Sequence, residues 1–167
     1  GLVNSHGIWI SGTESSNFNT TTINGNITTT GESKGIYVQD STNNITTVTG
    51  NIITSGTGGN AEPILLEGSD SNTFTLSGAV HSLGGDQAIS IDADSDSNTF
   101  IIQSGSTFVG DFENYGTNTV ITNQGTMDGI ENTGSIATFN NAQTGATYSG
   151  TLPVNYNIII NSPTTYG

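Results

Sequence analysis

The sequence contains no cysteine and no arginine, and Lys34 is its only lysine. Without cysteine the chain forms no disulfide and offers no thiolate to a metal ion. Fourteen acidic residues face the single lysine, which gives a formal net charge of −13. A nucleic-acid-binding protein needs several basic residues to neutralise phosphates, and an anionic membrane surface attracts basic segments. The composition therefore predicts no binding to nucleic acid and none to such a surface.

Long apolar runs are also missing. No stretch approaches the roughly 20 apolar residues that a membrane-spanning helix needs, so the sequence predicts no membrane insertion by this segment. The chain begins at Gly1, without a methionine or a signal peptide. We therefore expect a mature product or a piece of a longer protein.

Small polar residues dominate what is present. Gly, Ser, Thr and Asn supply 90 of the 167 residues (23, 19, 28 and 20). Such a composition is compatible with disorder, but here the apolar residues recur at regular intervals. Four short apolar runs share one plan and follow one another at nearly equal spacing: Ile8-Trp-Ile10, Ile36-Tyr-Val38, Ile64-Leu-Leu66 and Ile89-Ser-Ile91.

Each apolar run leads through a polar bend into a second run, a glycine and a third apolar position. The bends end in asparagine at 17, 44, 72 and 98, and the glycines stand at 25, 50, 78 and 105. The unit then shortens, because Gly105, Gly125 and Gly145 follow one another at a smaller, equal spacing. Val, Ile, Thr and aromatic residues favour strands, and repeats of this length with tight bends are typical of stacked solenoid coils.

The repeat predicts an all-β, single-domain parallel β-helix (a β-solenoid) with about six to seven coils. We expect coils over positions 1–150, long to about position 113 and shorter after it, and a closing or linking segment over 151–167. Alternation within the strands predicts which side chains point inward. Trp9, in the first run, is expected in the core or as a cap; the alternative is an exposed aromatic ring that stacks on a sugar. The residues expected to be buried and stacked between coils are Phe74, Leu76, Val80, Phe100, Ile102 and Phe108.

Three motifs resemble a known group of proteins. They are Gly-Ile-Tyr-Val at 35–38, Asn-Thr-Phe-Thr-Leu at 72–76 and Ile-Thr-Asn-Gln-Gly at 121–125. In these features roughly residues 7–150 resemble bacterial autotransporter passenger domains. The resemblance implies a right-handed parallel β-helix displayed outside the cell, commonly in adhesion, and it brings no catalytic residues. The stretch 152–160 has no matching repeat and looks like the segment that closes such a stack ahead of a translocator.

Acidic residues gather in the bends that follow the first strands of successive coils. Aligned on the next asparagine, these residues are Glu14, Asp40, Glu67, Asp70, Asp92, Asp94 and Asp96. The run from Asp92 to Asp96 resembles the opening of a calcium loop, in which alternating oxygen ligands point one way. Ser97 and Gln103 stand where such a loop has its turn glycine and its bidentate glutamate. Two interpretations stay open: a calcium site at Asp92, Asp94 and Asp96, and a solvated acidic edge. No other cofactor is expected.

Other polar residues favour structural roles. His6 and His81 are isolated, so no zinc site is expected. The threonine triplets at 20–22 and 28–30 resemble the arrays of ice-binding solenoids, but they do not recur as triplets in every coil. The corner asparagines are expected to form a hydrogen-bonded ladder, whose members are Asn17, Asn44, Asn72, Asn98 and Asn118.

Catalysis is not expected from this composition. A polysaccharide lyase needs a strong base and cationic groups that neutralise a uronate, and the chain has one lysine and no arginine. The leading hypothesis is an extracellular structural or adhesive segment of a secreted or bacterial surface protein, with cell-surface glycans or a second copy as partner. A self-assembling subunit of an extracellular filament is the alternative. A carbohydrate hydrolase with two carboxylates is the third possibility.

Overall fold

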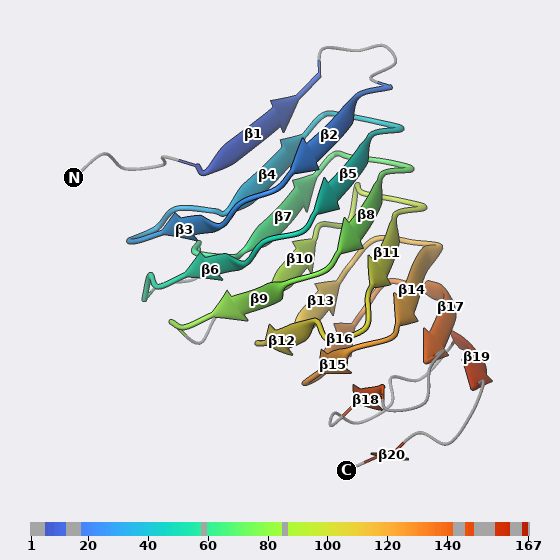
Figure 1. Cartoon of the computed structure of the whole chain (residues 1–167). Helices are drawn as coiled ribbons and strands as arrows, with labels where there is room; N and C mark the ends of the chain where they lie inside the picture. The colour runs from blue at the N-terminus through green and yellow to red at the C-terminus, as the bar shows by residue number, and fades with distance from the viewer. Residues whose placement is uncertain are drawn as a thin grey trace.

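Figure 1 shows the computed structural model of the chain. The structure describes residues 6–12, 18–57, 60–84, 87–141, 146–148, 156–160 and 165–166. Over these residues it contains twenty strands and no helix, so the predicted all-β class is confirmed. The strands pair in parallel with strands of the preceding and following turns.

Three parallel sheets run along the stack, and successive strands enter them in rotation (Figure 1). Sheet A contains β1 (Ile8–Ser11), β4 (Ile36–Gln39), β7 (Ile64–Glu67), β10 (Ile89–Ile91), β13 (Phe112–Asn114) and β16 (Ile130–Asn132). Sheet B contains β2 (Thr20–Ile23), β5 (Ile45–Val48), β8 (Thr73–Leu76), β11 (Thr99–Ile102), β14 (Thr119–Asn123), β17 (Ile136–Asn141) and β19 (Tyr156–Ile160). Sheet C contains β3 (Ile27–Thr29), β6 (Ile52–Thr54), β9 (Ala79–Ser82), β12 (Thr107–Val109), β15 (Thr126–Met127), β18 (Thr147–Tyr148) and β20 (Thr165–Tyr166). One strand from each sheet makes one turn, and the chain is a parallel β-solenoid.

Four full-length turns make up the first part of the solenoid, which differs from the six to seven coils expected. The strands of sheet A begin at Ile8, Ile36, Ile64, Ile89, Phe112 and Ile130, so the repeat becomes steadily shorter after the third of them. The later turns are short because the connection from sheet C to sheet A shrinks from residues 55–63 in the second turn to residues 110–111. Beyond them, β19 and β20 extend sheets B and C.

The core is a column of inward-pointing side chains between the three sheets. The ring centroids of Phe74 and Phe100 are 5.1 Å apart and the rings are nearly parallel, at 5°. Phe112 meets Phe100 edge-on, with centroids 4.9 Å apart. The predicted core is confirmed, because all six residues named for it are at most 2% exposed: Phe74, Leu76, Val80, Phe100, Ile102 and Phe108.

Successive turns approach each other closely at the bend between sheets B and C. A Cβ atom on Gly50 would lie 2.2 Å from the carbonyl oxygen of Gly25, and one on Gly78 would lie 2.3 Å from that of Gly50. Neither approach is possible for a real side chain, so these stacked bends require glycine. This contact explains the glycines at 50 and 78, whereas Gly105 is required by its left-handed φ of 84°.

A buried asparagine ladder holds the bend between sheets A and B. Asn44 Oδ1 accepts hydrogen bonds from the backbone N of Asn19 at 3.2 Å and from its Nδ2 at 3.0 Å. Asn72 Oδ1 likewise accepts from N and Nδ2 of Asn44, at 3.0 and 2.9 Å. Asn98 Oδ1 accepts from the backbone N of Asn72 at 2.9 Å. Each rung satisfies a backbone N–H that would otherwise be buried without a partner, and the prediction is confirmed at Asn44, Asn72 and Asn98.

The ladder differs from the prediction at its two ends. Asn17 lies outside the described residues, and Asn19 donates the first of the described rungs. Asn118 is exposed and left-handed, with φ of 56°. The register instead places buried Thr119 next to Asn98. The prediction for Asn118 is wrong: Asn118 holds the left-handed place that Asn43, Ser71 and Ser97 hold in the earlier turns, and the ladder position that follows it is occupied by Thr119 in place of an asparagine.

The outer face of sheet B carries two columns of β-branched residues. One column contains Thr20, Ile45, Thr73, Thr99 and Val120; the other contains Thr22, Thr47, Thr75, Ile101 and Thr122. The triplets of the sequence do not recur, but threonine at alternate positions does, through most of five turns. Since adjacent strands are about 4.8 Å apart, this face presents hydroxyl and methyl groups at a regular spacing.

Candidate functional site

The outer face of sheet A differs from the threonine-rich face, because it carries aromatic and acidic side chains. Its first outward column contains Trp9, Tyr37, Leu65, Ser90, Glu113 and Glu131. A second column, two residues further along each strand, begins with Ser11, Gln39 and Glu67. Tyr37, Leu65 and Ser90 point away from the core and are nevertheless buried. The surface is therefore hollowed above the middle of this sheet.

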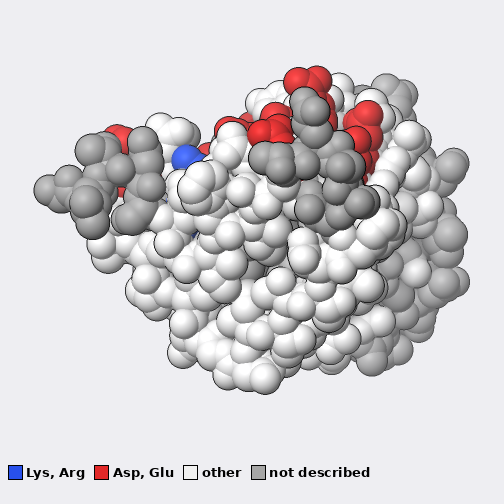
Figure 2. Space-filling model, turned by 90° about the horizontal axis from the view of Figure 1, so that it is seen from above, with Lys and Arg blue, Asp and Glu red and all other residues white. Residues whose placement is uncertain are grey.

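Figure 2 shows the acidic side chains gathered along one side of the molecule, with the single lysine, in blue, on the same side. The described bends between sheets A and B supply many of these carboxylates, including Asp40, Asp70, Asp92 and Asp96. The hollow above sheet A is therefore bordered by negative charge.

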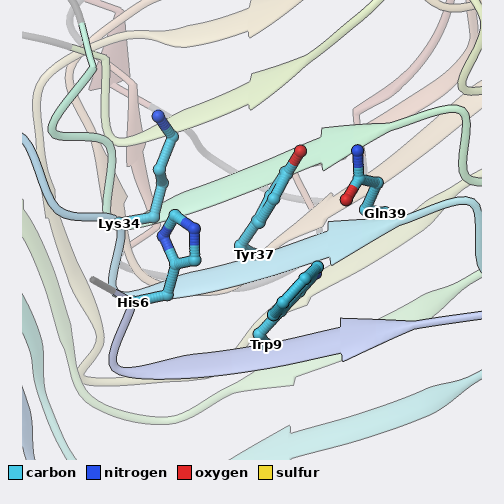
Figure 3. Close-up of a pocket in the computed structure, with 5 residues that line it drawn as sticks. All are labelled: His6, Trp9, Lys34, Tyr37 and Gln39. Carbon is cyan, nitrogen blue, oxygen red and sulfur yellow. The ribbon is translucent and has the colours of Figure 1, made fainter. Parts of the chain in front are cut away.

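A pocket of about 380 Å³ opens at the N-terminal end of this face. It is lined by His6, Trp9, Lys34, Tyr37 and Gln39 (Figure 3). The rings of Trp9 and Tyr37 are stacked, with centroids 6.2 Å apart and planes inclined by 15°. Trp9 is 60% exposed, so its expected place in the core is wrong: register and alternation put it outside, above the sheet. The pocket's volume lies in the range of ligand pockets (about 300–1,000 Å³), and together with the exposed indole this makes it a candidate site.

Polar contacts fix the back of the pocket. The Tyr37 hydroxyl donates a hydrogen bond to the Glu67 carboxylate. Burial raises the pKa of Tyr37 well above its ordinary value, and the bond to Glu67 raises it further. Lys34 Nζ lies 3.9 Å from Glu62 Oε2, and both side chains are nearly buried. Burial lowers the pKa of His6, and nearby Lys34 lowers it further, against the opposing effect of Glu67. At neutral pH the pocket thus has a neutral imidazole and one paired cation.

We expect the fluorescence of Trp9, the chain's only tryptophan, to report the protonation of His6. The two ring centroids are 6.2 Å apart, and an imidazolium quenches an indole in contact with it. Emission should be constant above neutral pH and fall through a midpoint below 6.5, because the pKa of His6 is lowered from that value. A fluorescence titration tests this. A midpoint above 6.5, or an unaltered curve in His6→Gln, would contradict the assignment.

Two of the three predicted calcium ligands, Asp92 and Asp96, accept hydrogen bonds within and between the bends. Asp92 Oδ1 accepts from Ser95 Oγ at 2.6 Å and from the backbone N of Asp94 at 3.2 Å. Asp96 Oδ1 accepts from both N and Oγ1 of Thr117, each at 2.7 Å. Within the part of the chain that the structure describes, no three His, Cys, Asp or Glu side chains are grouped to hold a metal. The calcium site at Asp92, Asp94 and Asp96 and the solvated acidic edge remain the two interpretations of these residues.

Glu113 is the most firmly held carboxylate on the outer face of sheet A. Its Oε2 accepts from Ser90 Oγ at 2.8 Å and its Oε1 accepts from the Tyr115 hydroxyl at 2.8 Å. The hydrogen bond to Glu113 raises the pKa of Tyr115. Glu131 follows Glu113 in register on the next strand. Glu113 and Glu131 are therefore the pair to test for the two-carboxylate hydrolase that the sequence left as a third possibility.

Sequence reasoning named Trp9 and His6 but did not bring them together, and it missed Gln39 as a pocket residue. A signal was present: Trp9 and Tyr37 belong to successive repeats and hold the same place in their strands. Gln39 ends β4 and stands in register with Ser11 and Glu67, whereas His6 and Lys34 come from the connections before β1 and β4 and follow no repeat pattern.

No protein-family model matches the chain, and no curated protein or solved structure shows significant similarity to it. Among the described residues there is no helical segment that could span a bilayer. Function is therefore inferred from the chain's own side chains and their arrangement.

Proposed function

We propose that the chain is a non-catalytic, adhesive segment of an extracellular β-solenoid that binds cell-surface glycans through its outward faces. The supporting observation is the outer face of sheet A, where an exposed indole, a buried tyrosine and amide and carboxylate groups share one hollow. The regular threonine columns of sheet B add a second polar face. A single hydrogen bond to a sugar hydroxyl contributes only about 1 kcal/mol. Many such contacts repeated along a solenoid raise the overall affinity for a polymeric glycan.

The composition supports a role without catalysis. No arginine or cysteine is present, so a cationic stabiliser and a thiol nucleophile are missing from the sequence. Glu113, on the outer face of sheet A, already accepts two hydroxyl hydrogen bonds. Such a group is positioned as an acceptor for hydroxyls, including those of a sugar.

The proposal includes the origin and geometry implied by the sequence motifs. The chain is proposed to be displayed at a bacterial cell surface, as in autotransporter passenger domains. Its coil is proposed to be right-handed, because parallel strand–crossover–strand connections take that hand in about 98% of cases.

Adhesion and catalysis are separated by one experiment. The purified chain is passed over immobilised neutral polysaccharides and incubated in parallel with the same soluble glycans. We expect retention on at least one surface and no release of reducing sugar. Turnover that disappears in both Glu113→Gln and Glu131→Gln would establish a hydrolase instead. Failure to be retained on any glycan surface would contradict the adhesive role.

A second candidate is self-association, which the N-terminal end of the stack supports. The strands β1, β2 and β3 end their sheets and each have a strand partner on one side. The inward residues Ile8, Ile10 and Ile23 are only partly buried against the core. Unpaired strand edges above exposed apolar side chains are a template for another coil.

We expect Ile10→Lys to abolish any concentration-dependent growth in light scattering, because it places a charge in that end. Thr22→Lys, on the outer face of the same turn, is the matched control and should leave growth unchanged. Equal assembly of both variants and the parent would show that the N-terminal end is not the contact. Electron microscopy distinguishes rods of one chain from filaments.

A further inference from the structure

The pocket at the N-terminal end of sheet A contains an exposed indole, Trp9, that is not part of the core. Trp9 is 60% exposed, whereas Tyr37, its neighbour in the column, is only 9% exposed. Tyr37 stacks against one face of the indole, and more than half of the Trp9 surface stays exposed. Single exposed apolar residues are common, but here the indole forms the floor and edge of a concave site with polar groups around it.

We propose that this pocket is a subsite for a neutral pyranose ring, which stacks its C–H face on Trp9. The proposal rests on the glycan-binding function and assigns it a residue and a ligand class. A pyranose has an apolar face of axial C–H groups and a rim of hydroxyls. Trp9 offers the matching apolar plane, and aromatic side chains with a polar border are the usual anchors of such sites.

The hydroxyl rim has hydrogen-bonding partners on both sides of the indole. Figure 3 shows His6 and Lys34 on one side of the two stacked rings and Gln39 on the other. An amide both donates and accepts, an ammonium donates three hydrogen bonds, and a neutral imidazole donates one and accepts one. A ring lying on Trp9 is therefore within a border that can satisfy both donor and acceptor hydroxyls.

Charge selects neutral sugars over uronates and sialates. The only cation of the pocket, Lys34, is already paired with Glu62. The carboxylates of Glu67, Asp40 and Asp92 lie close enough to act on the Tyr37 hydroxyl. The chain has a formal net charge of −13. Salt at 0.1 M screens charges mainly beyond about 10 Å, so the carboxylates near the pocket would still repel an anionic sugar bound in it. A neutral sugar meets no such barrier, and its hydroxyls can donate to the carboxylates.

The experiment uses the single tryptophan as its own reporter. The whole chain is titrated with neutral hexaoses (maltohexaose, cellohexaose and chitohexaose) and with hexagalacturonate, following Trp9 emission and saturation-transfer NMR. We expect a blue shift and saturable binding at millimolar concentration for at least one neutral hexaose, and none for hexagalacturonate. Trp9→Ala should weaken binding, read by NMR, by about tenfold or more, as for a central aromatic contact. Trp9→Phe should retain part of it.

Phe18→Ala is the matched control, since it removes another exposed aromatic residue that does not line the pocket. Thermal unfolding verifies that each variant keeps the fold. Absence of a response to every neutral hexaose, tighter binding of hexagalacturonate, or equal binding by Trp9→Ala and the parent would each overturn the subsite. If the parent and Trp9→Ala are retained equally on a glycan surface, adhesion stands and the subsite fails. If neither is retained on any surface, the adhesive function itself fails.

Discussion

Replacing Phe100 by alanine is expected to lower the free energy of unfolding by about 3–5 kcal/mol, the range for a buried phenylalanine that leaves a cavity. Phe100 is fully buried and lies between two other rings, Phe74 at 5.1 Å and Phe112 at 4.9 Å. Each ring pair contributes about 0.5–1.5 kcal/mol beyond the buried area. The strands on both sides are fixed by their ladders, so the cavity cannot close by a shift of one turn. Urea unfolding followed by circular dichroism measures the loss.

Phe18→Ala provides the comparison at the surface. Phe18 is 77% exposed, so its removal should change stability by no more than about 0.5 kcal/mol. Phe100→Leu should fall between the two, because leucine refills part of the space. A loss below about 1 kcal/mol for Phe100→Ala would mean that β11 does not pack its aromatic side chain inward.

The core was predictable because each turn of a solenoid repeats the same pattern of inward-pointing and outward-pointing positions. Within β8 and β11, the alternation at Phe74, Leu76, Phe100 and Ile102 fixes the inward face of each strand, and the interval between repeats sets the register. A mistake in one turn would have placed these apolar residues opposite polar ones. Agreement among four successive turns made the inward assignment secure from the sequence alone.

The place of Trp9 was not predicted because an apolar run of three residues does not reveal its alternation. In Ile8-Trp-Ile10 the middle residue looks like part of a continuous core strand. The same is true of Tyr37 and Leu65, which are outward and yet buried. They are covered because the face above sheet A is hollowed, a property of the connections on either side. Connection length is the most variable part of this repeat, and it decides where the pocket lies.

The acidic bends show a second kind of information that residue spacing does not contain. Spacing alone made Asp92, Asp94 and Asp96 resemble metal ligands. In the folded chain, Asp92 and Asp96 accept hydrogen bonds from backbone N–H groups, the common use of short carboxylates in bends. A pattern of residue types does not show which backbone groups a carboxylate contacts. Likewise, the spacing did not show that Asn118 takes the left-handed place of Asn43, Ser71 and Ser97, so that Thr119 follows it at the ladder position.

The second large loss of stability is expected in the asparagine ladder. Asn72→Ala is expected to lower the free energy of unfolding by about 3 kcal/mol, since each buried polar group left without a partner costs about 1–3 kcal/mol. Asn72 Oδ1 serves both the backbone N and Nδ2 of Asn44, and Asn72 Nδ2 serves the carbonyl of Ser41 at 2.9 Å. Alanine removes all three contacts within a site that is 1% exposed. Denaturant unfolding measures the change.

Two further variants distinguish the ladder from a general preference for asparagine in bends. Asn118→Gly should be nearly neutral, because Asn118 is exposed and its positive φ suits glycine. The double variant Asn44→Ala with Asn72→Ala should cost less than the sum of the two single variants, since the Nδ2 orphaned by the second change is removed by the first. Strictly additive losses, or a loss for Asn72→Ala no larger than for Asn118→Gly, would contradict the ladder. Coupling between these two asparagines, which lie one full repeat apart in the sequence, would instead demonstrate in solution that successive turns are joined at this bend.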